Sequence, residues 1–449
     1  MKKELLKLMM LALIAMPFAS CGNDDEPENV PEEPNKETPE EPSSEKPDDG
    51  EKPDDNVLMW LPATKPIELT DAQKDFVARS NDFSFNFYRA VNNREHGSNI
   101  TSPLSVGYLL GMMNDGAQGQ TSDEICRLLG YEAGDKASFD AFCRRLMEEA
   151  PQVDPSVTLR IANTVVANKQ VELEDLFKQK VEQSYFAGVN SLDFSQPSAL
   201  DWINNWCNEQ TGGMIPKLAD KLDPSALMVL MNAVYFNANW TEKFDAEDTK
   251  EEKFFGTDKS PRVPMMFRRA MTLYVENDIC SVLDLPYGGG ENHDRWNLFV
   301  LLPKTGKTVD DVVNSLSQTT WKELLDGLRT RTVNIWLPRF ATQSDLTLND
   351  VIANMGAPTM FNPESADFSP MTKNFKKADG QSLWVGLMKQ KTAMKITEDG
   401  TELTTITNGW SVHGGGFPDA DFHCNRPFVY VVQEASSGVI FFIGTFRGD

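Results

Sequence analysis

The chain has 449 residues, a hydrophobic fraction of 40% and a formal net charge of −24. Its length allows two or three domains of ordinary size or one large domain, and its hydrophobic fraction is enough for a sizeable core. A protein this acidic repels nucleic acid and anionic membrane surfaces, so we expect neither as a partner.

The first twenty residues form a targeting segment. MKKELLK is a basic start, and LMMLALIAMPFAS is an apolar stretch too short to span a bilayer as a mature helix. The segment leads into Phe18-Ala19-Ser20-Cys21, which resembles the lipobox of bacterial lipoproteins, where the cysteine is diacylated and becomes the new N-terminus. We therefore expect residues 1–20 to be a lipoprotein signal peptide and Cys21 to carry lipid. The alternative is an ordinary secretory signal.

Residues 21–55 are rich in acids and prolines. Residues 24–55 hold 15 Asp or Glu against 3 Lys, which is half of the net charge. Such a segment cannot bury enough apolar surface to fold, and its like charges extend it, so it is expected to be a disordered tether. Its start, Asn23-Asp24-Asp25-Glu26, resembles export signals of some Gram-negative surface lipoproteins. We expect an outer-membrane protein with its domain outside the cell; a spacer facing the periplasm is the alternative.

From Asn56 to Asp449 no further linker or repeat interrupts the chain, which indicates one folded domain over residues 56–449. The first half of this domain reads mainly as helices. Apolar residues recur at helical spacing over residues 75–91. A second helix is expected to begin at Ser102 and Pro103, with the serine capping it. A third covers residues 199–211 and is closed by two glycines.

The second half reads mainly as strands. The predicted strands cover residues 159–167 and 227–236 before the midpoint of the domain and residues 298–302, 332–337, 428–433 and 438–446 after it. The run from Leu227 to Phe236 is almost uninterruptedly apolar, which indicates a strand covered on both faces. Helices followed by strands predict an α+β fold.

The sequence contains none of the common catalytic or cofactor motifs that we sought. Its four histidines form no HExxH pattern, and no GxSxG elbow exists. The segment 304–308 is similar to a phosphate loop but lacks its first glycine, so we expect a turn. His413 and His423 have no further ligand at metal spacing. We therefore expect no enzyme activity, no cofactor and no metal. Without Cys21 five cysteines remain, an odd number without metal-like spacing, which indicates buried small apolar residues rather than disulfides.

Several blocks together resemble the serpin family over essentially all of residues 70–449. The stretch from Phe422 to Val432 resembles the serpin signature, centred on Asn425, Arg426, Pro427 and Phe428. Further matches lie at residues 99–105, 211–215, 232–245 and 302–304. The resemblance implies a monomeric domain of about nine helices and three β-sheets with an exposed reactive-centre loop.

In this family the loop is a bait for a protease. After the protease forms an acyl-enzyme with the loop, the cleaved loop inserts into the main sheet as a new central strand and traps the enzyme. The resemblance places the loop hinge at Glu398, Asp399, Gly400, Thr401, Glu402, Leu403, Thr404 and Thr405. The inward-facing positions Thr401, Leu403, Thr405 and Thr407 hold no proline and no charge, which favours an inhibitor. Leu403 and Ile406 are larger than is usual, so a non-inhibitory serpin acting as a surface binding module is the alternative.

The scissile bond is expected among Val412, His413, Gly414 and Gly415. No Lys or Arg lies between Lys395 and Arg426, so a trypsin-like target is not expected. Val412 suits an elastase- or subtilisin-like serine protease. Val412 followed by His413 would also suit a papain-like cysteine protease.

The resemblance also implies two supporting clusters. The shutter beneath the insertion site should include Ser102, Ser105, Asn232 and Gln390, the last at a position where the family often has histidine. The breach, where the loop first enters the sheet, should include Trp240 and Glu398, although a buried tryptophan is also compatible with plain core packing. Setting the resemblance aside, a solute- or glycan-binding lipoprotein with tryptophans lining its site is the remaining alternative.

Overall fold

A computed structural model describes residues 65–288, 296–380, 382–401 and 418–449. The chain divides into two units, Met1–Val57 and Leu58–Asp449, and every described residue belongs to the second. The predictions for residues 1–20, Cys21, the tether, residues 402–405 and residues 412–415 lie outside the described part. No helix in the described ranges is long and apolar enough to cross a membrane.

Nine α-helices lie in the described ranges, and six of them precede residue 211, as predicted. They are α1 (Asp71–Asn92), α2 (Pro103–Asp115), α3 (Gly119–Leu129), α4 (Lys136–Glu149), α5 (Asp175–Tyr185), α6 (Pro197–Gln210), α7 (Val309–Ser315), α8 (Gln318–Gly327) and α9 (Asn349–Asn354). Ser102 occupies the N-cap position of α2, but its side chain makes no cap hydrogen bond. The predicted capping is therefore wrong. Instead, the buried Ser105 hydroxyl donates to the Ser102 Oγ at 2.7 Å.

The six-stranded sheet contains the predicted apolar strand. Its order is β10 (Phe340–Thr347), β11 (Leu387–Thr397), β12 (Gly400–Thr401), β4 (Met228–Asn239), β2 (Thr158–Asn168) and β3 (Gly188–Leu192). β4 runs antiparallel to β2 over ten residue pairs. The apolar character of β4 follows from its interior position, because core residues contact one of its faces and α6 covers the other.

The remaining nine strands form one connected network. Its order is β1 (Asn99–Thr101), β15 (Val439–Phe446), β14 (Phe428–Glu434), β8 (Trp296–Pro303), β7 (Cys280–Tyr287), β6 (Arg262–Glu276), β9 (Arg329–Pro338) and β13 (Ala420–His423), with β5 (Lys250–Lys253) beside β6. The long strand β6 pairs with β9 over ten residues but with β7 over only three. The described strands thus form two connected sheets, of six and nine strands, in an α+β fold, as predicted; β6 links the two parts of the larger sheet.

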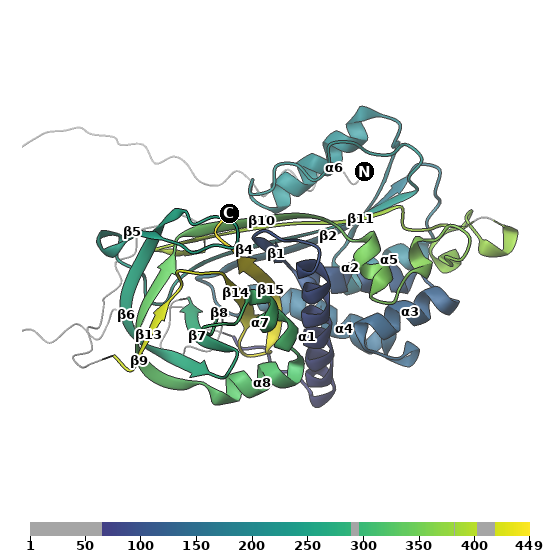
Figure 1. Cartoon of the computed structure of the whole chain (residues 1–449). Coiled ribbons are helices and arrows are strands. Elements are labelled where there is room, and N and C mark those ends of the chain that lie inside the picture. The colour runs from purple at the N-terminus through teal and green to yellow at the C-terminus, as the bar shows by residue number, and fades with distance from the viewer. Residues whose placement is uncertain (1–64, 289–295, 381, 402–417) are drawn as a thin grey trace, which may run out of the picture. The chain divides into compact units, whose positions relative to one another are not determined.

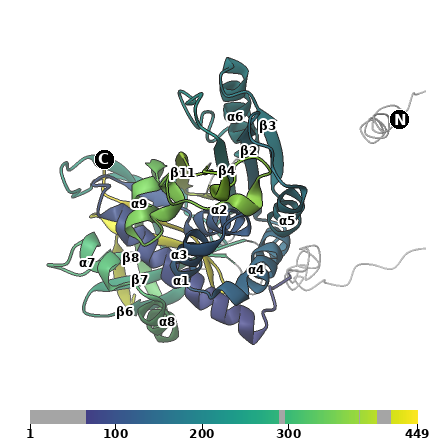
Figure 2. The ribbon, with the colours of Figure 1, turned by 90° about the vertical axis from the view of Figure 1, so that its right-hand side faces the viewer.

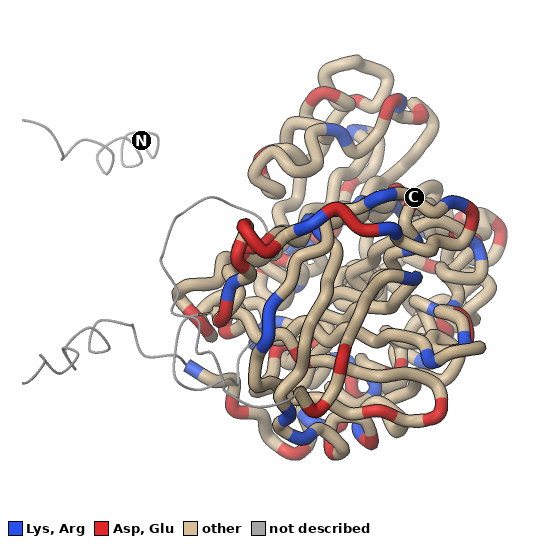
Figure 3. The backbone as a smooth tube through the Cα atoms, turned by 60° about the vertical axis from the view of Figure 1, so that its left-hand side comes forward, with Lys and Arg blue, Asp and Glu red and all other residues tan. Residues whose placement is uncertain are grey.

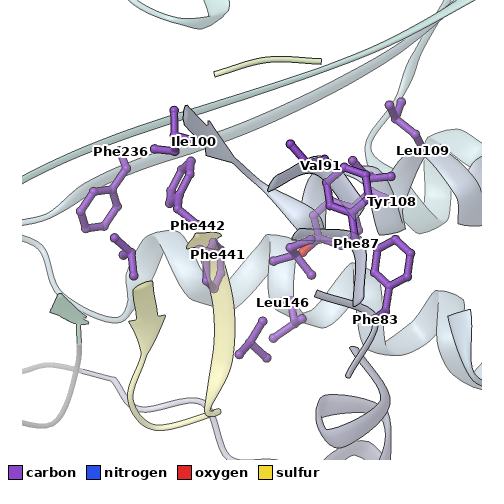
Figure 4. Close-up of a cluster of buried hydrophobic side chains, with 14 of the residues drawn as sticks. Phe83, Phe87, Val91, Ile100, Tyr108, Leu109, Leu146, Phe236, Phe441 and Phe442 are labelled. Carbon is purple, nitrogen blue, oxygen red and sulfur yellow. The ribbon is translucent and has the colours of Figure 1, made fainter. Parts of the chain in front are cut away.

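The main core lies between the six-stranded sheet, the β14–β15 hairpin and the first helices (Figure 1). Phe87 and Tyr108 from the helices and Phe236 and Phe442 from the strands are all buried there (Figure 4). α6 lies on the other face of the six-stranded sheet, close to β2 and β3 (Figure 2), where Ile203 packs in one cluster with Val229. All five cysteines in the described ranges are buried and free, as predicted.

Candidate functional site: a gap in the six-stranded sheet

The six-stranded sheet has a gap between β11 and β4. The two strands run parallel, but they pair directly only at Leu387–Val229 and Met388–Leu230. At the other end β12 lies between them, antiparallel to both. Among the described residues, 389–395 of β11 and 231–237 of β4 pair with no strand on the side of the gap. Backbone donors and acceptors along both edges are thus available to a further strand.

Both ends of the gap have the same register. At the directly paired end Leu387 lies level with Val229, and at the β12 end Thr401 lies between Ile396 and Ala238. At each end a β11 residue therefore matches the β4 residue 158 positions earlier. A strand continuing from β12 could fill the whole gap without a register slip, because the offset between β11 and β4 is the same at both ends.

Gly400 is the residue that allows β12 to fit. Its φ is +140°, a conformation that side-chain-bearing residues rarely adopt. A Cβ built on it would lie 2.2 Å from the carbonyl oxygen of Ala238. Thr401 follows it, and its hydroxyl shares a hydrogen bond with the Tyr287 hydroxyl at 2.6 Å. Thr401 thus faces the core, as predicted for this hinge position.

The breach residue Trp240 contacts the hinge directly. Its indole Nε1 donates to the Thr397 carbonyl at 2.9 Å, and its backbone N–H donates to the Asp399 carbonyl at 2.9 Å. The ring stacks on Tyr287 with the centroids 4.5 Å apart. Trp240 is therefore a core residue that also contacts Thr397 and Asp399, just before β12; its role as a breach residue stays a prediction.

The Glu398 carboxylate is held by charged and hydroxyl donors. Arg339 Nε donates to Glu398 Oε2 at 3.0 Å, and the Thr249 hydroxyl donates to Oε1 at 2.7 Å. Burial opposes ionisation of Glu398, but these hydrogen bonds more than offset it, and its pKa lies below the ordinary value. Lys243 forms an ion pair of 2.8 Å with the neighbouring Asp399. The hinge is thus fixed at the end of the gap by two ion pairs.

The structure brings three of the four shutter residues together. Gln390 Nε2 donates to the Ser102 carbonyl at 2.8 Å, and its Oε1 accepts from the Ser102 N–H at 3.3 Å. Ser105 joins through its bond to Ser102. The Gln390 amide uses both its donor and its acceptor, so β11 is tied to the start of α2 without a histidine.

Asn232, the fourth predicted shutter residue, makes its contacts on the other side of the gap. Its Nδ2 donates to Asn163 Oδ1 at 2.7 Å, and Asn163 Nδ2 donates to the Tyr185 carbonyl at 2.8 Å. Asn232 therefore ties β4 to β2. The gap separates a β11 side, held by Gln390, from a β4 side, held by Asn232.

The signature residues fix the chain after the loop. Phe428 is fully buried and packs against Phe340 and Phe446. Arg426 donates through Nη2 to the Pro303 carbonyl at 2.7 Å, and the Asn425 carbonyl accepts from the Phe255 N–H at 2.7 Å. Pro427 stands between these contacts, directly before β14. The segment leaving the loop is thus anchored in the core.

Sequence reasoning missed several partners at this site. Arg339 and Thr249 contact Glu398 across 59 and 149 positions of the chain, and Asn163 meets Asn232 across 69. No local pattern marks such pairs. The charge of Glu398 gave one clue, because a carboxylate next to a buried tryptophan requires a cationic partner.

The comparisons with known proteins agree with this geometry. A family model described as "Serpin (serine protease inhibitor)" matches residues 78–447. An uncharacterized serpin-like protein of Thermococcus kodakarensis is 30% identical over 391 residues, which cover 86% of this chain and 88% of the relative. The leukocyte elastase inhibitor of Homo sapiens is 28% identical over 381 residues, covering 81% and 97%. The solved structure of the thermophilic serpin Tengpin in its native state superposes with a TM-score of 0.76 at 24% identity, covering 86% and 97%.

Proposed function

Because the chain belongs to the serpin family, a family of protease inhibitors, we propose that it inhibits a serine protease as a suicide substrate. The protease cleaves the loop and is held as an acyl-enzyme while the cleaved loop enters the gap between β11 and β4. The inserted strand carries the protease along the sheet before the acyl bond can be hydrolysed.

The gap itself is the observation that carries this proposal. β12 already occupies one end of it, and β11 and β4 keep the same register at both ends. Each hydrogen bond gained on insertion contributes roughly 0.5–1.5 kcal/mol net. Seven unpaired residues on each edge thus give insertion a driving force on the order of 10 kcal/mol in total.

The register also says where each loop residue would lie. Each step along the loop moves one residue back along both β11 and β4. Leu403 would lie between Met394 and Phe236, both buried, so the core side of this position is already apolar. Thr407 would lie between Gln390 and Asn232, and its hydroxyl would meet the two shutter amides. Uncharged residues at these positions fit the gap.

An elastase- or subtilisin-like protease is the target that the loop composition favours. The leukocyte elastase inhibitor is among the relatives, and Val412 provides the small apolar residue that such an enzyme accepts. We place the scissile bond between Val412 and Gly415. A papain-like cysteine protease, which reads an apolar residue one position before the cut, is a second target to test.

We further propose that a lipid on Cys21 anchors the inhibitor to the outer membrane of a Gram-negative bacterium, with the acidic tether holding the domain outside. The lipobox-like residues before Cys21 and the composition of residues 24–55 support this location. Replacing Cys21 with serine should release the protein from the membrane fraction. Protease added to intact cells should remove the domain; a protected domain would place it in the periplasm.

The inhibition is tested with the lipid-free chain, residues 22–449. It is mixed with an elastase, a chymotrypsin, a subtilisin and papain, and the products are separated on denaturing gels. We expect a detergent-resistant band near the summed mass of inhibitor and serine protease, and a released peptide whose mass places the cut between residues 412 and 415. Clean cleavage by every enzyme, with no gain of heat stability in the cleaved chain, would instead support a non-inhibitory serpin.

A further inference from the structure

A cavity of about 510 Å³ lies where the chain returns from the loop to the sheet. It is lined by β6, the start of β9 and the first residues after the loop, among them Tyr274, Arg329, Arg331, Asp419 and Ala420. β13 runs parallel to β9, with Ala420 level with Val333. Arg331, two residues before Val333, therefore stands beside Pro418, the first described residue after the loop.

Arg331 is an exposed cation without an ion pair to any residue in the described ranges. Arg329 is exposed as well, but its Nη1 donates to the carbonyls of Asp326 and Leu328 and thereby supports the end of α8. Two acids also line the cavity. Glu276 pairs with Lys304 at 2.5 Å, whereas Asp419 Oδ2 accepts from the backbone N–H of Thr332 at 2.8 Å and keeps its charge. The carbonyl contacts of Arg329 leave its charge uncompensated as well, so both arginines contribute positive charge here. Within the described ranges, Arg331 is the one of the two whose side chain makes no hydrogen bond.

The short stretch of chain between the proposed scissile bond and the cavity limits how far apart the two can lie. The proposed scissile positions, 412 to 415, lie only four to seven residues before Asp419. An extended chain spans at most about 3.6 Å per residue, so the cut lies within roughly 15–25 Å of the cavity. Even a small domain is on the order of 30 Å across. A protease bound to the scissile bond is therefore close enough to contact the cavity before the loop inserts.

On the premise of the proposed function, we propose that Arg331 and the cavity around it form a docking surface for the target protease. This surface fits an acidic group on the protease, on the side of its active-site cleft that binds the residues after the scissile bond. Acidic and basic residues alternate along the chain on this side of the domain (Figure 3), and the whole chain carries a charge of −24. Against that background an unpaired arginine beside the loop provides local attraction for an acidic partner. Such attraction acts mainly on the rate of encounter.

The test compares two charge reversals that change the net charge equally. Arg331→Glu removes the proposed contact, and Arg127→Glu, on α3, is the matched control. Arg127 is also exposed. The helix that carries it, α3, lies on the opposite side of the domain from β9 and β13 (Figure 1). Both are made in the lipid-free chain, and melting curves confirm that each folds. The measured quantity is the second-order rate constant for loop cleavage by subtilisin and by an elastase, at about 0.02 M and 0.5 M salt.

We expect Arg331→Glu to lower the rate constant about fivefold or more at low salt for at least one protease and to have little effect at high salt, where screening shortens the range of the charge. Arg127→Glu should stay within about twofold of the parent. Equal rates for the two variants would overturn the docking surface. The experiment measures cleavage and not the formation of a trapped complex. A chain that is cleaved without forming a complex would therefore refute the proposed inhibition, while its cleavage rate would still test the docking surface. If no protease cuts between residues 412 and 415, both proposals fall.

Discussion

At the scale of single residues, the hinge depends on a glycine. Gly400 has a positive φ, and an added Cβ would collide with the β4 backbone at Ala238. Gly306 also has a positive φ but has open space around it, which makes it a matched control. We expect Gly400→Ala to lower the melting temperature by several degrees and Gly306→Ala by only about one or two degrees. The substitution at Gly306 introduces backbone strain alone, whereas the one at Gly400 adds a steric clash with β4. Equal losses would mean that the close approach to β4 is unimportant.

The Glu398–Arg339 pair predicts a pH dependence. The pKa of Glu398 is lowered in the folded chain, so its pairing stabilises the fold above the ordinary carboxyl range and is lost as the pH falls through the folded value. Melting curves of the parent and of Glu398→Gln should differ most above the ordinary carboxyl range and converge as the pH falls below it, through the lowered pKa of Glu398. A constant difference over the whole range would show that the charge of Glu398 plays no part.

At the scale of elements, the register of β12 in the gap predicts which loop residues would face the core after insertion. Thr405 would enter between Thr392 and Val234 on the core side, whereas Thr404 would face the opposite side of the sheet. Burying an unpaired charge costs several kcal/mol, so Thr405→Arg should slow insertion enough to turn the inhibitor into a substrate. Thr404→Arg is the control. The ratio of cleaved to complexed chain on denaturing gels should rise tenfold or more for the first variant only; similar ratios would contradict the register.

A second element-scale prediction concerns the junction of α2, α4 and α5. Burial, helped by the nearby Asp140, raises the pKa of Asp115 at the end of α2 to about 7, against the attraction of Lys180 and Lys136. Because the folded pKa exceeds the unfolded one, this group costs stability as the pH rises from about 4 to about 7. Asp115→Asn should therefore raise the melting temperature at pH 8 and change it little at pH 4. No gain at pH 8 would refute the buried carboxyl pair.

The long elements could be predicted from sequence and the short ones could not. The apolar run of β4 and the periodicity of α1 are local patterns, and both elements form where predicted. β12 has only two residues and forms because β11 and β4 leave a space for it, so no local sequence pattern predicts it. Likewise Ser102 has the chemistry of a helix cap, but its buried neighbour Ser105 determines its bond.

At the scale of the whole molecule, the fold follows from motifs far apart in the chain that meet in space. The signature after the loop, the α2 start and the exit of β4 were recognised separately. The structure brings the α2 start and the exit of β4 to the two ends of one gap, and it anchors the signature in the core through Phe428. What sequence reasoning lacked were the links across this gap, such as Arg339 to Glu398, because they join residues whose proximity depends on the complete fold.

The central claim, that the cleaved loop fills the gap between β11 and β4, can be measured by hydrogen exchange. Peptides covering residues 387–397 and 228–239 would be followed by mass spectrometry in the intact chain and in the chain cleaved within the loop. We predict that exchange of both peptides slows by at least about tenfold after cleavage, because a new strand pairs with both edges. Unchanged exchange in both peptides would show that the loop stays outside the sheet and would contradict the account.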